Sequence, residues 1–221
     1  PSNETLGGRT WDELEGWDDD ARYYKDMVEY HDKVIGRVSD KLAELGIADD
    51  TLVIYVGDNG SPIEVCSTVH SHTEVCGGKG LTVDRGTHVP LIANWPGTIP
   101  AGHVENDLID SSDFLPTIME AAGITAPSDY VMDGRTFLPQ LKGEKGNSRE
   151  WVYFHFEPMS GRVHRFARYI RTHQYKLYDD GRLFDVNDDP EEQSAFDAAT
   201  DNDERATVRA HLLPVFDQMV K

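Results

Sequence analysis

The sequence has 221 residues, of which 38% are hydrophobic and 28% are charged, and its formal net charge is −19 at pH 7. A chain of this length can bury the core of one large domain or of two small ones. The acidic balance argues against nucleic acid and anionic membrane surfaces as partners, because both repel a negatively charged protein. No run approaches the roughly 18 apolar residues of a membrane helix, so we expect a globular protein with neither partner.

The first regular elements are a predicted helix and a predicted strand. Between Ala21 and Leu45 the apolar residues recur at helical spacing, and Gly46 is placed to end the helix as a C′ glycine. Leu52–Val56 is a run of five apolar residues, typical of a strand buried on both faces. A helix followed by such a strand predicts an α/β fold with a covered sheet.

Two polar side chains, Asp58 and Asn59, stand between glycines directly after this strand. A carboxylate and an amide oxygen are hard ligands, which suit Ca²⁺ or Mg²⁺ better than soft metals. The ends of sheet strands are also where α/β proteins place their sites. Asp, Asn and Gly are also common turn residues, so Gly57-Asp58-Asn59-Gly60 is compatible with a plain turn as well as with a metal site.

Residues 57–88 are predicted to form one long loop, which in a compact domain is usually functional or disordered. The loop contains the two cysteines of the chain, Cys66 and Cys76, which are compatible with one disulfide or with two free thiols. With His70 and His72 they supply four zinc-capable side chains, but their spacing matches no common zinc finger. A strand from Val89 to Trp95 follows, and then a helix from Asp113 to Gly123.

The pattern changes after about residue 146. Two stretches, Trp151–Phe156 and Phe166–Tyr178, have the composition of strands, and Asp180-Gly181 is a hairpin signature. Asp203–Val220 predicts an amphipathic helix with Val208, Leu212, Val215, Phe216 and Met219 on its apolar face. We therefore predict two segments, an α/β segment over residues 1–145 and a small antiparallel subdomain over residues 146–221. The second segment also contains the one basic stretch of the chain: Arg162, His164, Arg165, Arg168, Arg171 and His173. These are predicted to be paired or solvated strand residues, and recognition of a sulfated glycan is the alternative.

Several motifs, in order along nearly the whole chain, resemble the sulfatase family. The family has Gly-Lys, a short run to Gly-X-Arg-Val-Pro, an apolar strand and Trp-Pro-Gly. The corresponding residues here are Gly78-Lys79, Gly86-Thr87-His88-Val89-Pro90, the strand that follows and Trp95-Pro96-Gly97. The sequence Leu52 to Gly60 is similar to the family's metal strand, and later landmarks match at Asp133–Pro139 and Arg182–Glu191.

The resemblance implies a formylglycine-dependent, arylsulfatase-like sulfuric ester hydrolase of the alkaline-phosphatase-like superfamily, and a periplasmic or secreted location. Asp58 and Asn59 match two ligands of the family's Ca²⁺, with Mg²⁺ the less favoured ion, and Lys79 matches the lysine that contacts the sulfate. His88 stands where the family often has arginine, which makes it a candidate substrate contact or a structural histidine. The implied substrate is a sulfate ester, with a sulfated glycan as one candidate.

One feature of the family is not found in the sequence. Its nucleophile lies in Cys/Ser-X-Pro/Ala-X-Arg, and neither Cys66 nor Cys76 begins such a motif. We therefore expect this chain to correspond to the C-terminal half of a sulfatase, with the formylglycine and the further metal ligands in the N-terminal half. The chain alone is expected to be inactive. The expected fold is the C-terminal part of an alkaline-phosphatase-like α/β sandwich plus a small antiparallel β-sheet subdomain with a C-terminal helix.

Two alternatives stay open on the sequence alone. A phosphate or phosphonate ester hydrolase of the same superfamily would share the fold, but such enzymes commonly carry histidine after the metal-binding aspartate, where this chain has Asn59. A non-catalytic binding protein is the other alternative.

Overall fold

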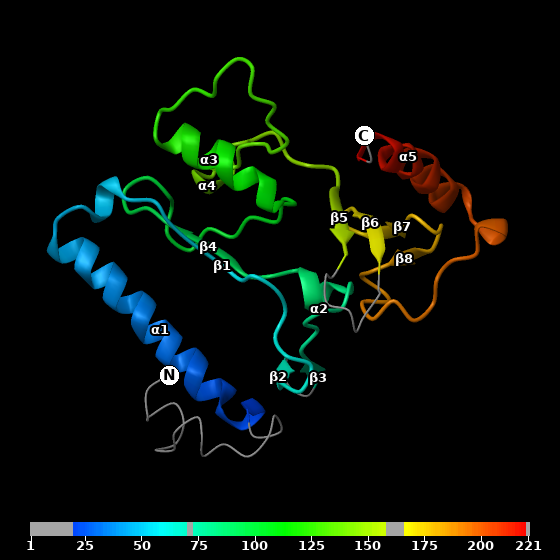
Figure 1. Cartoon of the computed structure of the whole chain (residues 1–221), viewed down its shortest axis with the longest axis horizontal. Helices are drawn as coiled ribbons and strands as arrows, with labels where there is room; N and C mark the ends of the chain where they lie inside the picture. Colours follow the sequence, from blue (N-terminus) through cyan, green and yellow to red (C-terminus); the bar gives the residue numbers. More distant parts are fainter. Residues whose placement is uncertain (1–19, 70–72, 158–165, 220–221) are drawn as a thin grey trace. The chain divides into compact units, whose positions relative to one another are not determined.

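The computed structural model of the chain describes residues 20–69, 73–157 and 166–219 (Figure 1). They form two compact units. One comprises Pro1–Leu81 with Arg85–Ile99, and the other comprises Thr82–Asp84 with Pro100–Lys221. The predicted boundary between residues 145 and 146 falls inside the second unit, and it stays a prediction about the two segments of the chain. Within the described ranges no helix has the length and apolarity needed to cross a membrane.

The first unit begins with the long helix α1 (Asp20–Glu44), close to its predicted bounds. It ends as the sequence predicts, because Gly46 has a φ of 68° and the amide of Ile47 donates to the Leu42 carbonyl oxygen at 3.1 Å. These are features of a Schellman C-cap, in which a residue with positive φ closes the last turn. A short 3-10 turn, η3 (Ala48–Asp50), leads from the helix into strand β1 (Val53–Val56).

Strand β1 pairs antiparallel with β4 (Leu91–Asn94), with Val53 opposite Asn94 and Val56 opposite Leu91. The predicted burial on both faces is not found in the described residues. Val56 is 43% exposed and Ile92 60% exposed, and the apolar stripe of α1 is also largely accessible to solvent. A two-stranded sheet with one neighbouring helix has too few elements to cover both of its faces.

The predicted loop of residues 57–88 contains regular structure, which the sequence analysis missed. Strands β2 (Cys66–Val69) and β3 (Thr73–Cys76) form a hairpin, and α2 (Asp84–Thr87) is a single helical turn before β4. The strands were missed because their Ser, Thr and Glu residues show no run of apolar side chains, which is the main sequence signal of a strand.

The second unit contains the predicted small antiparallel sheet. Its four strands pair in chain order: β5 (Val152–Phe156), β6 (Ala167–Arg171), β7 (Tyr175–Tyr178) and β8 (Leu183–Asp185). The predicted strand Phe166–Tyr178 is two strands, because Thr172 makes a tight turn in which its amide donates to the Tyr175 carbonyl oxygen at 2.8 Å. The β7–β8 turn is as predicted, with Gly181 at a φ of 90°.

The core of this unit lies on both faces of the sheet. On one face Ile170, Leu177 and Leu183 pack against Leu212 and Phe216 of helix α5 (Asp203–Met219), which Figure 1 shows against the sheet. On the other face four side chains form a second cluster: Tyr169, Tyr178, Phe184 and Val186. The apolar face predicted for α5 is confirmed at its buried positions, whereas Met219, the last helical residue, is 44% exposed.

The remaining elements of the second unit are short. They are η4 (Ser111–Asp113), α3 (Phe114–Ala121), α4 (Leu138–Leu141) and η5 (Ala198–Thr200). The buried carboxylate of Asp113 at the end of η4 connects this turn to two later loop residues, since it accepts bonds from the backbone amide of Arg135 at 2.6 Å and from the guanidinium of Arg149 at 2.7 Å.

Candidate functional site

The polar pair after β1 is held by backbone bonds on both sides. The amide of Gly57 donates to the Pro90 carbonyl oxygen, and the amide of Gly60 donates to the Gly86 carbonyl oxygen, both at 3.0 Å. Residues 57–60 therefore run alongside residues 86–90, the segment that enters β4. His88 is exposed and lies between these two bonds, in the segment next to Asp58 and Asn59.

The donor set of this segment fits a hard divalent cation. Asp58 is exposed and Asn59 half-buried, and one carboxylate oxygen of Asp58 accepts the backbone amide of Asn59 at 2.9 Å. A carboxylate and an amide oxygen next to each other are suitable Ca²⁺ ligands, but the ion takes six to eight oxygens. In the described part of the chain no cluster of three or more His, Cys, Asp or Glu residues could hold a metal ion. Asp58 and Asn59 alone would supply only part of such a ligand set.

Lys79 is held close to this pair through its backbone. Its amide donates to the carbonyl oxygen of Ser61 at 3.0 Å, and Ser61 follows Asn59 by two residues. The hydroxyl of Ser61 is bonded to the hydroxyl of Tyr24 on α1 at 2.7 Å, which attaches the same segment to the helix. The side chain of Lys79 is exposed. The main chain is thus fixed while the ammonium group stays accessible.

Glycines allow the loops around Lys79 to pack backbone against backbone. A methyl group on Gly77 would lie 2.0 Å from the Pro62 carbonyl oxygen, and one on Gly60 would lie 2.1 Å from the Arg85 carbonyl oxygen. Gly78 and Gly86 are equally crowded, because an added methyl carbon would lie within 2.7 Å of backbone atoms at each. Since real Cβ atoms do not approach so closely, these positions require glycine. The glycines of this region therefore allow three segments of the chain to pack closely.

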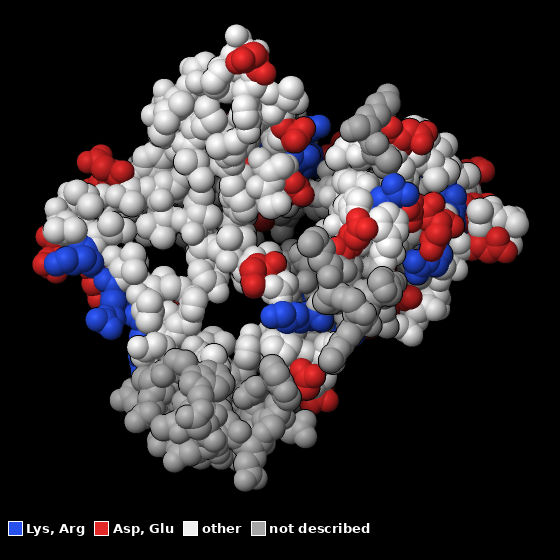
Figure 2. Space-filling view, in the orientation of Figure 1, with Lys and Arg blue, Asp and Glu red and all other residues white. Residues whose placement is uncertain are grey.

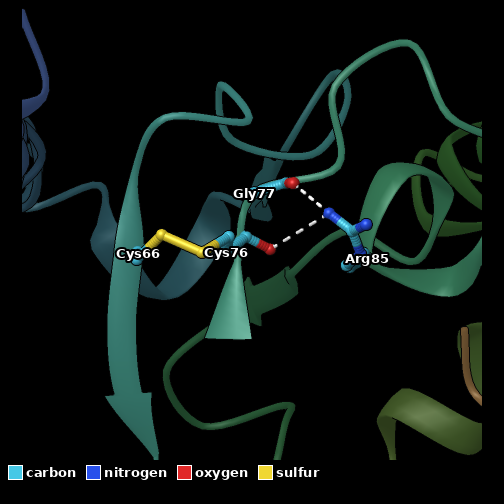
Figure 3. The surroundings of a disulfide bond; sticks show 4 residues. All are labelled: Cys66, Cys76, Gly77 and Arg85. Atoms are coloured by element: carbon cyan, nitrogen blue, oxygen red, sulfur yellow. Dashed lines mark hydrogen bonds between the residues drawn. A yellow bond between two sulfur atoms is a disulfide. The ribbon is translucent and has the colours of Figure 1, made fainter. Parts of the chain in front are cut away.

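A disulfide closes the hairpin that precedes Lys79. Cys66 and Cys76 are opposite each other in the β2–β3 register and are joined through their sulfurs (Figure 3). The amide of Gly77 bonds to the Val65 carbonyl oxygen at 2.8 Å, so the two cysteines form a non-hydrogen-bonded pair, in which the side chains of facing residues are closest. The sequence was compatible with one disulfide or with two free thiols, and the structure has the disulfide. It also removes both sulfurs as thiolate ligands for zinc, while His70 and His72 lie outside the described residues.

Arg85 has a role in this region that was not predicted from the sequence. Its guanidinium donates to the backbone carbonyl oxygens of Cys76 and Gly77, as Figure 3 shows. The bonds connect the end of the hairpin to the segment that carries His88. The available signal in the sequence was a charged residue next to Gly86, but it does not show that the partners of the arginine are carbonyl groups.

Two arginines of the basic stretch of the second segment form ion pairs, whereas His173 is exposed. Arg168 contacts Asp179 and Arg171 contacts Asp84, each at 2.8 Å. Figure 2 shows Lys and Arg side chains among Asp and Glu side chains on this part of the surface. The prediction of paired strand residues is confirmed for these two arginines, whereas Arg162, His164 and Arg165 lie outside the described residues.

Two family models match the chain. The model described as Sulfatase matches residues 2–124, and the model described as N-sulphoglucosamine sulphohydrolase, C-terminal, matches residues 78–219. An arylsulfatase of Hemicentrotus pulcherrimus is 28% identical over 162 residues, which are 72% of this chain and 29% of that protein. An N-acetylgalactosamine-6-sulfatase of Canis lupus familiaris is 35% identical over 132 residues, which are 59% of this chain and 25% of that protein. The chain thus spans less than a third of the length of these relatives.

The fold is also similar to that of solved structures. The structure of BT4656 in complex with its substrate D-glucosamine-2-N,6-O-disulfate aligns with a TM-score of 0.72 and 24% identity, over 89% of this chain and 40% of that chain. At this level of identity the similarity establishes the fold alone. The predicted fold class, part of an alkaline-phosphatase-like α/β fold with small antiparallel sheets and a C-terminal helix, is confirmed.

Proposed function

Because the chain belongs to the sulfatase family, we propose that it forms the part of a sulfuric ester hydrolase that contributes Asp58, Asn59 and Lys79 to the active site. The observation that supports this most directly is the bond from the amide of Lys79 to the Ser61 carbonyl oxygen. It brings the backbone of the lysine next to the segment that begins with the two candidate metal ligands. Two motifs about 20 residues apart in the sequence are thereby combined in one set of packed loops.

Asp58 and Asn59 would hold the divalent cation that is typical of the family, and we propose Ca²⁺ as that cation. When bound, such an ion neutralises charge on sulfate oxygens and polarises the ester. The exposed carboxylate of Asp58 supplies the charge, and the adjacent amide supplies a neutral oxygen. The remaining ligands would come from water, from backbone or amide oxygens, or from carboxylates outside the described residues.

Lys79 is proposed to contact the sulfate group. An ammonium group on a flexible stem has three donors and can follow the sulfuryl oxygens as negative charge develops on them. Its fixed backbone and exposed side chain suit this role. His88 is proposed as a second substrate contact, because it lies in the segment alongside Asp58 and Asn59 and its ring nitrogens can donate or accept a hydrogen bond.

The covalent step is proposed to depend on residues outside this chain. The family's formylglycine is made from Cys or Ser in a motif that the sequence does not contain, and both cysteines are bonded to each other. With the nucleophile elsewhere, the metal ligands and the lysine have no covalent step to assist. We therefore propose that the 221-residue chain alone is inactive.

The proposed substrate is a sulfate ester on a glycan. The similarity to an N-acetylgalactosamine-6-sulfatase supports this substrate class. The test is to express the full-length protein and to assay it against a sulfated amino sugar, an aryl sulfate and an aryl phosphate. We expect hydrolysis of the sulfates that is lost in Asp58→Ala and Lys79→Ala. Faster hydrolysis of the phosphate would assign the protein to the phosphoesterases instead, and equal rates in wild type and variants would overturn the site.

A further inference from the structure

The side chain of Lys176 on strand β7 is completely buried and lies in a cluster of charged and polar groups. Its ammonium nitrogen is 2.6 Å from a carboxylate oxygen of Glu192 and 4.0 Å from the centroid of the Tyr169 ring. Burial lowers the pKa of Lys176, while the carboxylates of Glu192 and Asp84 act in the opposite direction. Burying an ammonium group has a large desolvation free energy unless the group is paired. A buried ion pair is by itself weak evidence that the residue stabilises the fold.

Side chains of the sheet bind one short segment of the chain, Thr82–Asp84. The ammonium group of Lys176 donates to the backbone carbonyl oxygen of Thr82, and the hydroxyl of Tyr178 is 2.9 Å from the Thr82 hydroxyl. The guanidinium of Arg171 contacts the carboxylate of Asp84 at 2.8 Å. Thr82–Asp84 belongs to the same compact unit as the sheet, so these are contacts within one unit.

Glu192 completes the cluster from a strained backbone position. It has a φ of 54°, the one positive value for a non-glycine residue in the described ranges, and its side chain is 6% exposed. One of its carboxylate oxygens accepts a bond from Lys176, and the other accepts the hydroxyl of Tyr178 at 2.5 Å. A left-handed backbone at a non-glycine residue is uncommon and is maintained only where its surroundings compensate for it. Here the strained turn places the carboxylate between both side chains that hold Thr82.

In the sequence, the segment Thr82–Asp84 lies between the two candidate substrate contacts. Thr82 is three residues after Lys79, and Asp84 is four residues before His88. A loop that is fixed at its middle has fewer backbone conformations on either side. Small displacements of a group that contacts substrate can reduce the rate by about a hundredfold.

We infer that Lys176, with Tyr178 and Glu192, is a positioning residue of the active site, which fixes Thr82–Asp84 and thereby the loop that carries Lys79 and His88. The inference rests on the proposed function, since it assigns the cluster a role in that same site. Lys176 itself touches neither substrate nor metal in this assignment.

A single and a double variant distinguish an effect on the position of the loop from an effect on the stability of the fold. Lys176→Met removes the ammonium group and leaves Glu192 buried without it, so we expect a lower melting temperature. Lys176→Met combined with Glu192→Gln removes both charges, and we expect the melting temperature to recover most of the loss. Because the bond to the Thr82 carbonyl oxygen is still missing, hydrogen exchange of residues 81–88 in the 221-residue chain should remain about tenfold or more faster than in wild type.

The same double variant in the full-length enzyme should have kcat reduced by about 10-fold to 100-fold with a small change in KM. If the exchange rates of residues 81–88 and kcat of the double variant return toward wild-type values together with its melting temperature, the cluster acts only through stability. That result would overturn the inference. If Lys176→Met does not fold, Tyr178→Phe removes only a hydroxyl and should raise exchange over the same residues.

Arg209 provides the matched control in the same unit. It forms a buried ion pair with Asp201 at 2.5 Å and donates to the Phe196 carbonyl oxygen at 2.8 Å, and neither contact involves residues 82–84. Arg209→Met should lower the melting temperature without accelerating exchange over residues 81–88 relative to the rest of the unit. Selective acceleration there in the control would count against the inference. Exchange does not require turnover, so it tests the positioning role even where the proposed function fails.

Discussion

The amide of Lys79 donates to the carbonyl oxygen of Ser61 at 3.0 Å, so the backbone of the lysine is fixed next to the segment that follows Asp58 and Asn59. Its side chain is exposed, in contrast to that of Lys176, which is completely buried. The two lysines therefore have different physical situations. Replacing Lys79 removes a mobile charge and little packing, whereas replacing Lys176 disturbs a buried network.

In the full-length enzyme, Lys79→Ala should lower kcat/KM by about two to three orders of magnitude. This is the usual effect of losing one preorganised donor to developing negative charge. Lys79→Arg should restore activity only in part, because a planar guanidinium does not replace a compact ammonium group. Lys145, another exposed loop lysine, is the control, and Lys145→Ala should leave the kinetics unchanged. Steady-state kinetics with wild-type rates for Lys79→Ala would refute the assignment.

The isolated chain should bind Ca²⁺ weakly, with a dissociation constant of about a millimolar. Asp58 and Asn59 supply two of the six to eight oxygens that the ion requires, so water must fill the rest. Isothermal titration calorimetry on the wild-type chain and on Asp58→Ala measures this, with Asp49→Ala as an acidic control outside the site. Micromolar affinity that depends on Asp58 would mean that the site is complete within this chain.

The chain alone should not hydrolyse an aryl sulfate, with or without Ca²⁺, because the formylglycine motif is not in its sequence. The measurement is release of the phenol by the purified chain after repeated chromatography. Turnover that survives repurification and disappears in Asp58→Ala would contradict this prediction.

Gly60→Ala should lower the melting temperature of the chain, with a loss of stability of about 1–3 kcal/mol. The added methyl group would lie 2.1 Å from the Arg85 carbonyl oxygen, so the two loops must move apart. Gly36 is the matched control, since it lies in α1, where an added methyl group would have no atom within 4 Å apart from those of its own stretch of helix. Gly36→Ala should raise stability by about 0.5–1 kcal/mol through higher helix propensity. Equal effects of the two substitutions would show that the close packing around Gly60 is not required.

Asp113→Asn should destabilise the chain at neutral pH by about 3 kcal/mol, the usual effect of removing one partner of a buried ion pair. Burial raises the pKa of Asp113, but hydrogen bonds from Arg149 and from the amides of Arg135 and Asp110 outweigh it, so the pKa lies below the ordinary 3.8. A carboxyl whose pKa is lowered by folding contributes stability above its unfolded value and loses it as pH falls through the folded value. The difference between wild type and variant should therefore persist from pH 7 to about pH 4 and shrink below it.

Urea denaturation of both proteins at pH 7 and at pH 3 measures this dependence. The control is Asp180→Asn, because Asp180 pairs with Arg182 on the surface, with side chains 54% and 51% exposed. Its effect should stay below about 1 kcal/mol. A difference between wild type and Asp113→Asn that stays constant down to pH 3 would show that the ionised carboxylate is not the source of the stability.

Much of the chain's local structure was predictable from sequence because its causes are local. The apolar spacing of α1, the positive φ of Gly46 and the Asp-Gly turn before β8 depend on residues within a few positions of one another. Asp58 and Asn59 were singled out as hard ligands at the end of a strand, and Lys79 was assigned from its match to a motif of the sulfatase family. Their roles remain predictions.

The tertiary structure decided which distant segments meet. The bond between Cys66 and Cys76 depends on the register of a hairpin whose strands carry no apolar pattern. Lys176 lies within a predicted strand that gave no sign of a buried charge, and its partner Thr82 is 94 positions away. Such a contact leaves no periodic signal in the sequence, because a buried charge is tolerated wherever the fold supplies a partner, and only the packed chain shows which partner that is.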